Sequence, residues 1–165
     1  MIVGMSYKKV AEMSTRMNRA EMGVATQTSF HNKKTYFEFL SHFETSNLEK
    51  IKAGVIDHFH TTAKIKASHP INEAAQGIGY YSDIILPITQ SLDGFTRQNY
   101  IVLGGEYQGT EWVTSNGYFY GHFKKPLFGI PPSNKMAFLR FGEFHKMENG
   151  EITETYVYLG LAELI

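Results

Sequence analysis

One glutamate stands in a pattern that could place a carboxylate inside an enclosed site. Glu143 alternates with Leu139 and Phe141, so the three side chains share one face of a predicted strand. If that face lines an aromatic cavity, the loss of water around the carboxylate raises its pKa toward neutrality, as a general acid or base requires. The alternative is a Glu143 that pairs with Arg97 or Arg140 or points to solvent, because glutamate is rarely buried without a partner.

His69 is the second candidate for acid/base chemistry. It precedes Pro70, which disfavours regular structure at that point, so it lies where a predicted strand gives way to a predicted helix. Loop residues that a scaffold holds in place often carry function, although His69 could equally form a structural hydrogen bond. Asn72 could orient a ligand carbonyl or cap the helix that follows.

Four more side chains are candidates for ligand contact. Trp112, the single tryptophan of the chain, could stack on a planar ligand or pack in the core. Arg140, His122 and His145 stand on predicted strands. One sequence does not fix which face of a strand carries them, so their role depends on which side of the sheet encloses the pocket.

Composition excludes several kinds of chemistry. The chain has no cysteine, which rules out thiolate catalysis, disulfides and Cys-ligated metals. His58 and His60 fall on different faces of a helix end without a nearby carboxylate pair, so we predict no metal site. The formal net charge is zero, which favours neither nucleic acid nor an acidic membrane as a partner. No apolar run approaches the roughly 20 residues of a membrane span, and no signal peptide is recognisable. We expect a cytoplasmic protein.

The elements that would position these groups begin with an aromatic helix. Tyr36 and Phe39 belong to a set of apolar side chains at helical spacing, and this helix is predicted to start near Asn32. Residues 1–31 are predicted to be an N-terminal extension, partly helical over 6–22. Residues 32–165 are predicted to form one domain, which their number allows.

Two further helices are expected. Ser46 and Glu49 stand three residues apart in the form of a capping box, just before a stripe of apolar side chains. Another helical stretch follows Gly77, and Pro87 should kink it or split it in two.

The C-terminal part of the chain is predicted to be β. A half-exposed strand is expected over 61–67, and a turn over 104–109. Asn149-Gly150 is the preferred pair for a type I′ hairpin turn. The long strands are predicted at 95–103, 111–123, 136–147 and 151–159.

Four long antiparallel strands would present one apolar face, which helices on that side can cover. Gly117 and Gly121 lie inside a predicted strand and allow the sheet to curl. The sequence therefore predicts an α+β fold: a cone-shaped, curved antiparallel sheet wrapped around the N-terminal helices and enclosing a pocket.

Three motifs follow one another in the C-terminal half. LFGIPPSN at 127–134 is similar to a F/L-G-I-P-P-T-G segment, LRFGEFH follows at 139–145, and NGEITE at 149–154 is similar to D-G-K-I-x-E. In this order and spacing they resemble the SnoaL-like polyketide cyclases of the nuclear transport factor 2-like superfamily. The resemblance covers roughly 33–164 and implies the cone-shaped fold with its pocket.

The resemblance also implies a chemistry. In these cyclases an intramolecular aldol closes a ring without a cofactor, and an aspartate on the last strand does the acid/base work with a histidine on the preceding strand. Matched through the Pro-Pro and Gly anchors, those positions fall on Val157 and Glu143, and the aspartate of a related subgroup falls on Gly160. Since neither Val157 nor Gly160 can transfer a proton, any chemistry would rest on Glu143 and His69, with Val157 among the ligand-contacting positions.

Three functions remain open. The first is cofactor-free acid/base chemistry on a small, mostly apolar carbonyl compound. The second is non-catalytic binding of a small hydrophobic or aromatic ligand. The third is homodimerisation through the aromatic positions of 111–123 together with Glu154, Tyr156 and Tyr158. Glu143 in a closed pocket beside His69 would support the first. Glu143 locked onto an arginine would argue against it, and an interior filled by Phe and Tyr side chains would leave only the dimerisation module.

Overall fold

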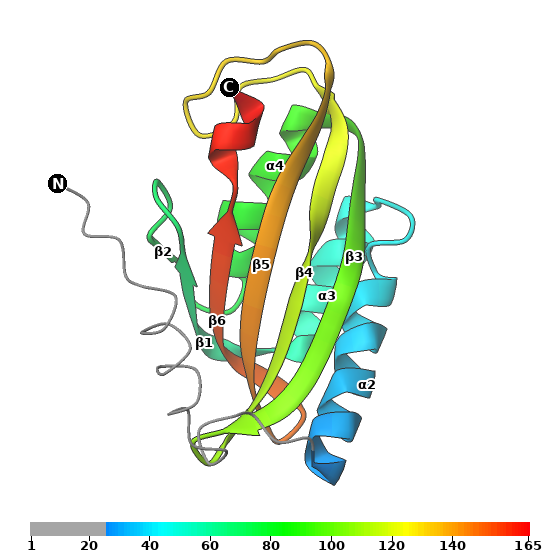
Figure 1. Cartoon of the computed structure of the whole chain (residues 1–165), viewed down its shortest axis with the longest axis vertical. Helices are drawn as coiled ribbons and strands as arrows, with labels where there is room; N and C mark the ends of the chain where they lie inside the picture. The colour runs from blue at the N-terminus through cyan, green and yellow to red at the C-terminus, as the bar shows by residue number, and fades with distance from the viewer. Residues whose placement is uncertain (1–25) are drawn as a thin grey trace, which may run out of the picture.

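The computed structural model describes residues 26–165. Their elements form a curved sheet with helices packed against its concave side (Figure 1). In chain order they are α2 (Gln27–Ser41), α3 (Leu48–His58), β1 (Phe59–Ala67), β2 (Glu73–Ala74), the π-helical turn η2 (Tyr80–Ile85), α4 (Leu86–Ser91), β3 (Leu92–Tyr107), β4 (Thr110–Phe123), β5 (Met136–Glu148), β6 (Glu151–Leu159) and the 3₁₀ turn η3 (Leu161–Leu164). The predicted α+β cone is confirmed.

The six strands are ordered β2-β1-β6-β5-β4-β3. β1 lies parallel to β6, whereas the other neighbouring strands are antiparallel. The four long strands β3 to β6 are antiparallel as predicted, and the parallel pairing of β1 with β6, which the sequence did not predict, makes the whole sheet mixed. Hydrophobic alternation predicts where strands lie, but it carries no information about the direction of a long-range neighbour.

The pairing of β3 with β4 is irregular at two points. The register of β3 against β4 shifts between Asp93 and Thr96 and again between Asn99 and Ile101. At Gly117 of β4 an added Cβ would lie only 2.1 Å from the backbone oxygen of Gln98. The strands can approach this closely because residue 117 has no side chain, which fits the predicted role of glycine in the curvature.

α2 begins at Gln27, earlier than the expected start near Asn32. Thr26 is its N-cap and forms a capping box with Ser29, and both hydroxyl groups donate to the carboxylate of Glu111 at 2.6 Å. The predicted helix within 6–22 lies outside the described residues. The division into an extension and a domain therefore stays a prediction.

The next helix starts differently from the expectation. Asn47, not Ser46, caps α3 by accepting hydrogen bonds from the backbone N–H groups of Glu49 and Lys50. Ser46 adopts φ 50° and donates its hydroxyl to the carbonyl of Phe95 instead. The N-cap of α3 is therefore one residue later than predicted, and the predicted pairing of Ser46 with Glu49 as a capping box was wrong.

Residue types close together in the sequence explain the break at Pro87 and the turn at Asn149 and Gly150. Pro87 lies in the first turn of α4, directly after η2, so the predicted helix is indeed split there. Asn149 and Gly150 both have positive φ, 53° and 82°, as the predicted type I′ turn requires. The 104–109 turn is confined to its last two residues, and Gly104 lies within β3, where an added Cβ would be 2.9 Å from the carbonyl oxygen of Ser29.

The concave side of the sheet is filled by side chains. Its largest fully buried members include Tyr36, Tyr80, Phe39, Phe119, Phe123 and Phe141. The described side chains therefore fill the centre of the cone, where an enclosed pocket was expected. No helix among residues 26–165 is long and apolar enough to cross a membrane.

Candidate functional site

Glu143 lies at the centre of the molecule with none of its surface exposed. On β5 the buried positions alternate through Leu139, Phe141 and Glu143, so the predicted shared face is the concave one. Glu143 pairs across the sheet with Ser115 of β4 and Val157 of β6. The carboxylate is therefore surrounded by the sheet on one side and by the helices on the other.

Arg97 of β3 neutralises this carboxylate. Its Nη2 lies 2.5 Å from one oxygen of Glu143, and its side chain is 1% exposed. The guanidinium also stacks on aromatic rings, 4.8 Å from the centroid of Phe43 and 4.5 Å from that of Phe141. Of the two arginines considered as partners, the structure thus selects Arg97 and not Arg140.

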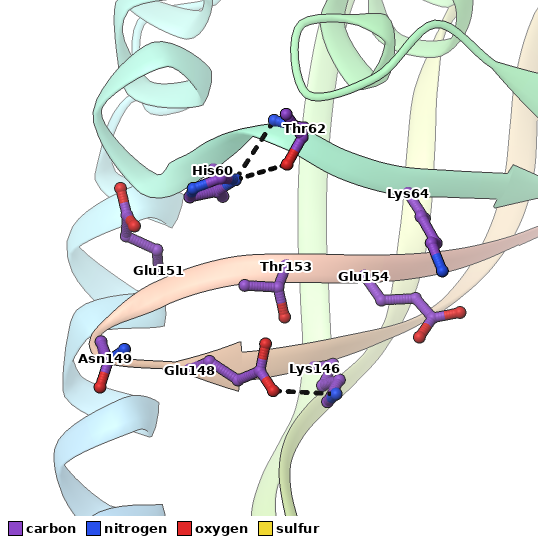
Figure 2. Close-up of a pocket in the computed structure, with 9 residues that line it drawn as sticks. All are labelled: His60, Thr62, Lys64, Lys146, Glu148, Asn149, Glu151, Thr153 and Glu154. Carbon is purple, nitrogen blue, oxygen red and sulfur yellow. Dashed lines mark hydrogen bonds and ion pairs between the residues drawn. The ribbon is translucent and has the colours of Figure 1, made fainter.

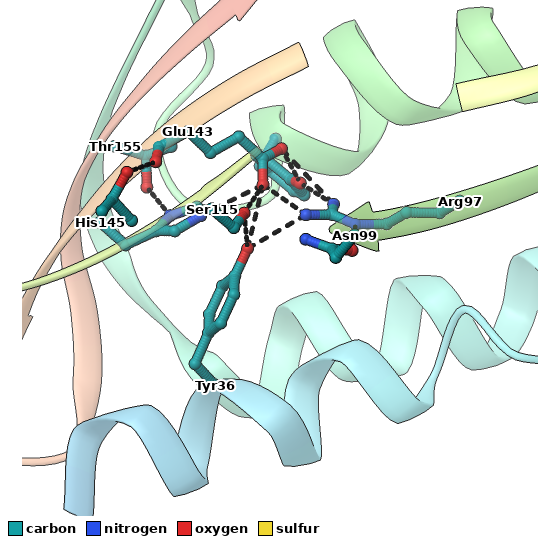
Figure 3. A network of polar contacts seen from close by, with 9 residues as sticks. Tyr36, Arg97, Asn99, Ser115, Glu143, His145 and Thr155 are labelled. Atoms are coloured by element: carbon teal, nitrogen blue, oxygen red, sulfur yellow. Dashed lines mark hydrogen bonds and ion pairs between the residues drawn. The ribbon is translucent and has the colours of Figure 1, made fainter. Parts of the chain in front are cut away.

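Two tyrosines from the helical layer close the network, and Figure 3 labels one of them, Tyr36. Tyr36 of α2 donates its hydroxyl to Glu143 at 3.1 Å, and Tyr80, the first residue of η2, donates at 2.6 Å. Arg97 in turn donates to both phenol oxygens, at 3.0 and 2.8 Å. Ser115 lies 2.8 Å from the Tyr36 hydroxyl. Each oxygen of the carboxylate is therefore held by several donors.

His145 completes the network on the β6 side. Its Nε2 lies 3.4 Å from Glu143 and its Nδ1 lies 3.0 Å from the hydroxyl of Thr155. An ionised carboxylate can only accept, so Nε2 carries the proton and donates it to Glu143. In a neutral ring Nδ1 then accepts from Thr155. These two hydrogen bonds together fix one tautomer of the His145 imidazole.

The electrostatics favour the charged pair. Burial alone would raise the pKa of Glu143, but the charge of Arg97 and the hydrogen bond from His145 outweigh burial and hold that pKa below its ordinary value of 4.5. Glu143 likewise outweighs burial at Arg97 and raises the pKa of the guanidinium. Burial raises the pKa of both Tyr36 and Tyr80. At neutral pH the site is therefore an ion pair with two neutral phenols.

The other predicted acid/base residue lies elsewhere. His69 and Asn72 are exposed in the turn that follows β1, and Asn72 has φ 58°. Within the described part of the chain no hydrogen bond or ion pair joins either of them to Glu143. The predicted candidates Glu143, His145 and Val157 meet in the interior, whereas His69 and Asn72 do not join them.

Three further candidates project from the convex side of the sheet. Arg140 donates to the Tyr118 hydroxyl at 3.0 Å and pairs with Glu163 at 3.4 Å. His122 is exposed near the end of β4. Trp112 is half-buried at the other end of that strand, so it belongs to an outer surface and not to the core.

Trp112 lines a groove of about 720 Å³ on this convex side, which we call the aromatic groove. The groove crosses β3 to β6, at the C-terminal end of β3 and the N-terminal end of β4. Its lining is Leu103, Gly104, Gly105, Glu106, Tyr107, Trp112, Thr114, Phe144, Tyr156 and Tyr158.

A second, polar cleft of about 820 Å³ lies between β1, β6 and the β5–β6 hairpin (Figure 2). Acidic and basic side chains share it, and some already satisfy one another, as Lys146 and Glu148 do at 2.9 Å. His60 uses its Nδ1 to accept from the backbone N–H of Thr62. Among residues 26–165 no group of His, Asp and Glu side chains is arranged to hold a metal ion. The cleft therefore presents no field of one sign to a ligand.

Several residues of the interior network were not singled out from the sequence. Tyr36 was placed on an aromatic helix face, but nothing indicated that its hydroxyl would reach a carboxylate. Tyr80 and Ser115 carried no signal at all, because their contacts bridge distant segments of the chain. Arg97 was considered only as one possible partner, and the strongest hint was the lack of any other way to bury Glu143 at low cost.

Comparison with known proteins identifies solved structures of similar fold. No protein-family model and no curated protein matches the sequence. A proposed SnoaL-like polyketide cyclase from Jannaschia sp. CCS1 is similar in structure, with TM-score 0.65 and 14% identity over 84% of this chain and 91% of that one. IdmH from Streptomyces antibioticus, a proposed polyketide cyclase, gives 0.60 and 13% over 81% and 94%. An NTF2-like protein from Burkholderia thailandensis E264 gives 0.60 and 9% over 80% and 92%.

These identities are low, so the likeness concerns the fold. At that level the resemblance to SnoaL-like and NTF2-like proteins is confirmed, and it extends over most of the described residues. The chemistry of those proteins does not transfer with the backbone, because function depends on the residues of a site.

Proposed function

We propose that this chain is a non-catalytic member of the cyclase-like structures and works as a homodimer through the convex side of its sheet. The observation that carries the non-catalytic part of the proposal is the burial and ion pairing of Glu143. The carboxylate at the candidate acid/base position is ion-paired with Arg97 and fully buried, and it lies in an interior filled by aromatic side chains.

Such a carboxylate is a poor general base. A base works best when its pKa lies near the working pH, whereas the pKa of Glu143 is held below 4.5. Its oxygens already accept from Arg97, Tyr36 and Tyr80. A substrate would have to displace these donors before it could transfer a proton to Glu143. In this role Glu143 satisfies buried polar groups and connects β5 to β3 and to both helical elements.

The convex side supplies a surface that needs a partner. We call Tyr100, Tyr118, Tyr120, Met136 and Phe138 the outer aromatic patch. Phe138 is 52% exposed and Tyr100 is 59% exposed. The rings of Tyr120 and Phe138 stack at 5.6 Å, and Tyr118 meets Phe138 edge-on at 6.2 Å. Contiguous exposed apolar surface marks interaction sites, and a twofold axis lets the same patch pair with itself.

The patch gives a direct prediction. Phe138→Glu is expected to convert the dimer into a monomer, because a twofold interface would bring two new carboxylates into an apolar contact. Light scattering coupled to size exclusion should give twice 18.8 kDa for the parent chain and 18.8 kDa for the variant. Phe37→Glu is the matched control, since Phe37 is 50% exposed on α2, away from the patch, and this variant should remain a dimer. A parent chain that is monomeric at every concentration would contradict the proposal.

A second candidate function is favoured by one specific observation. Glu143, Arg97, His145, Tyr36 and Tyr80 converge from separate elements, and clusters of perturbed titratable groups are frequent in active sites. Tyr80 also opens a π-helical turn, a feature common at functional sites. This candidate is cofactor-free acid/base chemistry on a small, mostly apolar carbonyl compound. Mass spectrometry of small molecules that co-purify with the protein tests it: a carbonyl compound retained by the parent chain and lost from a folded Glu143→Gln variant would favour a ligand site at Glu143 over a purely structural role.

A further inference from the structure

The outer aromatic patch is too small to hold a dimer together by itself. It consists of a handful of side chains, whereas a stable protein–protein interface takes about 20–30 residues from each partner. The same convex side carries a second apolar surface, the aromatic groove. On β4, Trp112 and Thr114 line the groove. Tyr118 and Tyr120 of the patch share their face, because all four side chains alternate with the buried positions of that strand. Groove and patch are therefore neighbouring parts of one surface.

The groove is hollow, and the side chains that it exposes are apolar. Leu103, Phe144 and Tyr158 are large, exposed side chains of its lining. Glu106 also borders the groove, but it pairs with Glu111, whose carboxylate accepts from hydroxyl groups at the start of α2. The Glu106 side chain therefore points to the helical side of the sheet. Apolar side chains gain free energy when they cover such a lining, whereas a charged occupant would lose its hydration without a partner.

Asn116 and Gly142 separate the groove from the patch. They pair with each other across β4 and β5. Along β4, Tyr120 of the patch follows Asn116 by four residues, and Trp112 of the groove precedes it by four. At about 3.4 Å per residue, the patch and the groove extend to roughly 14 Å on opposite sides of this pair.

We propose that the homodimer places the patch of each copy in the aromatic groove of the other, about a twofold axis at Asn116 and Gly142. The axis lies between the two stacked sheets and runs across their strands, so the Tyr120 end of β4 in one copy covers the Trp112 end in the other. This inference rests on the proposed homodimer and adds where its axis passes. An axis through the patch would press rings against rings and leave both grooves in water, with less apolar area buried.

The charge beside the patch is compatible with this contact. Arg140 stacks on Tyr118, with its guanidinium carbon 5.5 Å from the ring centroid. It also pairs with Glu163 at 3.4 Å. A paired arginine brings no net charge to the interface, and arginine that stacks on an aromatic ring is a common component of protein–protein contacts.

Thiol crosslinking tests the position of the axis. The chain has no cysteine, so each substitution supplies one thiol per copy. In Asn116→Cys the two thiols face each other across the roughly 10 Å between stacked sheets, and a short bismaleimide should join them into a covalent dimer on a denaturing gel. In Phe138→Cys, four residues from Gly142, the thiols lie about 27 Å apart along the strands and should not be joined. Ile56→Cys, exposed on α3, is the control for random collisions.

Trp112 reports on the same contact without any substitution. It is the single tryptophan of the chain and lines the groove. Its emission should move to longer wavelength when the dimer is diluted into monomers, because water then reaches the groove. A patch that pairs only with itself predicts an unchanged emission. This measurement tests the docking even if Phe138→Cys weakens the dimer.

Light scattering on the same samples keeps this inference separate from the homodimer. Crosslinking of Phe138→Cys above the level of Ile56→Cys, with or without that of Asn116→Cys, would overturn the docking and leave the dimer standing. A dimer in which Asn116→Cys is not crosslinked would overturn it as well. A parent chain that is monomeric at every concentration would refute both the homodimer and the docking.

Discussion

Arg97→Ala should destabilise the protein by about 3–5 kcal/mol, the cost of removing one partner from a buried ion pair. The variant would leave the Glu143 carboxylate buried without its compensating charge. It would also remove the guanidinium that stacks on Phe43 and Phe141. Since domains are typically stable by only about 5–15 kcal/mol, urea unfolding followed by circular dichroism should show a much lower midpoint or no folded state.

A second substitution separates the charge from the lost packing. In Arg97→Ala the added change Glu143→Gln removes the uncompensated charge, so the double variant should be more stable than the single one. Independent sites would instead add their losses. The matched control is Arg140→Ala, which breaks a surface pair with Glu163 and should cost no more than about 1 kcal/mol. A double variant that is less stable than Arg97→Ala would show that Glu143 is not a charge in need of Arg97.

Gly117→Ala is expected to have the next largest effect. An added Cβ would lie 2.1 Å from the backbone oxygen of Gln98 and 2.7 Å from Cζ of Phe141. The carbonyl belongs to the paired strand β3, so it cannot move without disturbing the ladder between β3 and β4. Overpacking of this kind costs about 1–3 kcal/mol and occasionally more, and we expect the upper end of that range in thermal or urea unfolding.

Gly142→Ala provides the comparison for that variant. Its added Cβ would approach only the side-chain oxygen of Asn116, at 3.0 Å, and a side-chain end can move. The loss of stability at Gly142 should therefore be clearly smaller than at Gly117. Similar losses at both positions would mean that backbone entropy, and not the close approach of β3 and β4, explains why these strands contain glycine.

Local patterns predicted much of the β-sheet. The alternation of Leu139, Phe141 and Glu143 placed all three on one face, and that face is the buried one. Asn149 and Gly150 fixed the last hairpin, because a type I′ turn requires positive φ at both positions. Pro87 marked the break between η2 and α4. These features depend on residues close together in the sequence, where period and turn chemistry are sufficient.

The features that were missed depend on contacts between distant segments. The parallel pairing of β1 with β6 leaves no trace in either strand. The network around Glu143 joins α2, η2, β3, β4 and β5, so no single stretch of sequence contains it. For a related reason the sequence did not show on which side of the sheet Trp112 lies. The alternation of side chains separates the two faces of a strand but does not indicate which face is buried.

The proposal of a non-catalytic homodimer depends on the interior carboxylate being structural. A Glu143 whose pKa in the folded state lies below 4.5 stabilises the fold above about pH 4.5. That stabilisation is lost as the pH falls toward the lower folded-state value, because protonation then weakens the pair with Arg97. A general acid or base would behave differently and would titrate near the working pH.

The measurement that decides between these roles is the pKa of Glu143 itself, from the ¹³C shift of its side-chain carboxyl carbon, with Glu143→Gln used to assign the signal. We predict that this signal keeps the value of an ionised carboxylate from neutral pH down to pH 4.5 and below, for as long as the protein stays folded, whereas a glutamate in a model peptide titrates at about 4.3. A midpoint between about pH 6 and 7 would contradict the structural role and identify Glu143 as a group that exchanges protons under working conditions.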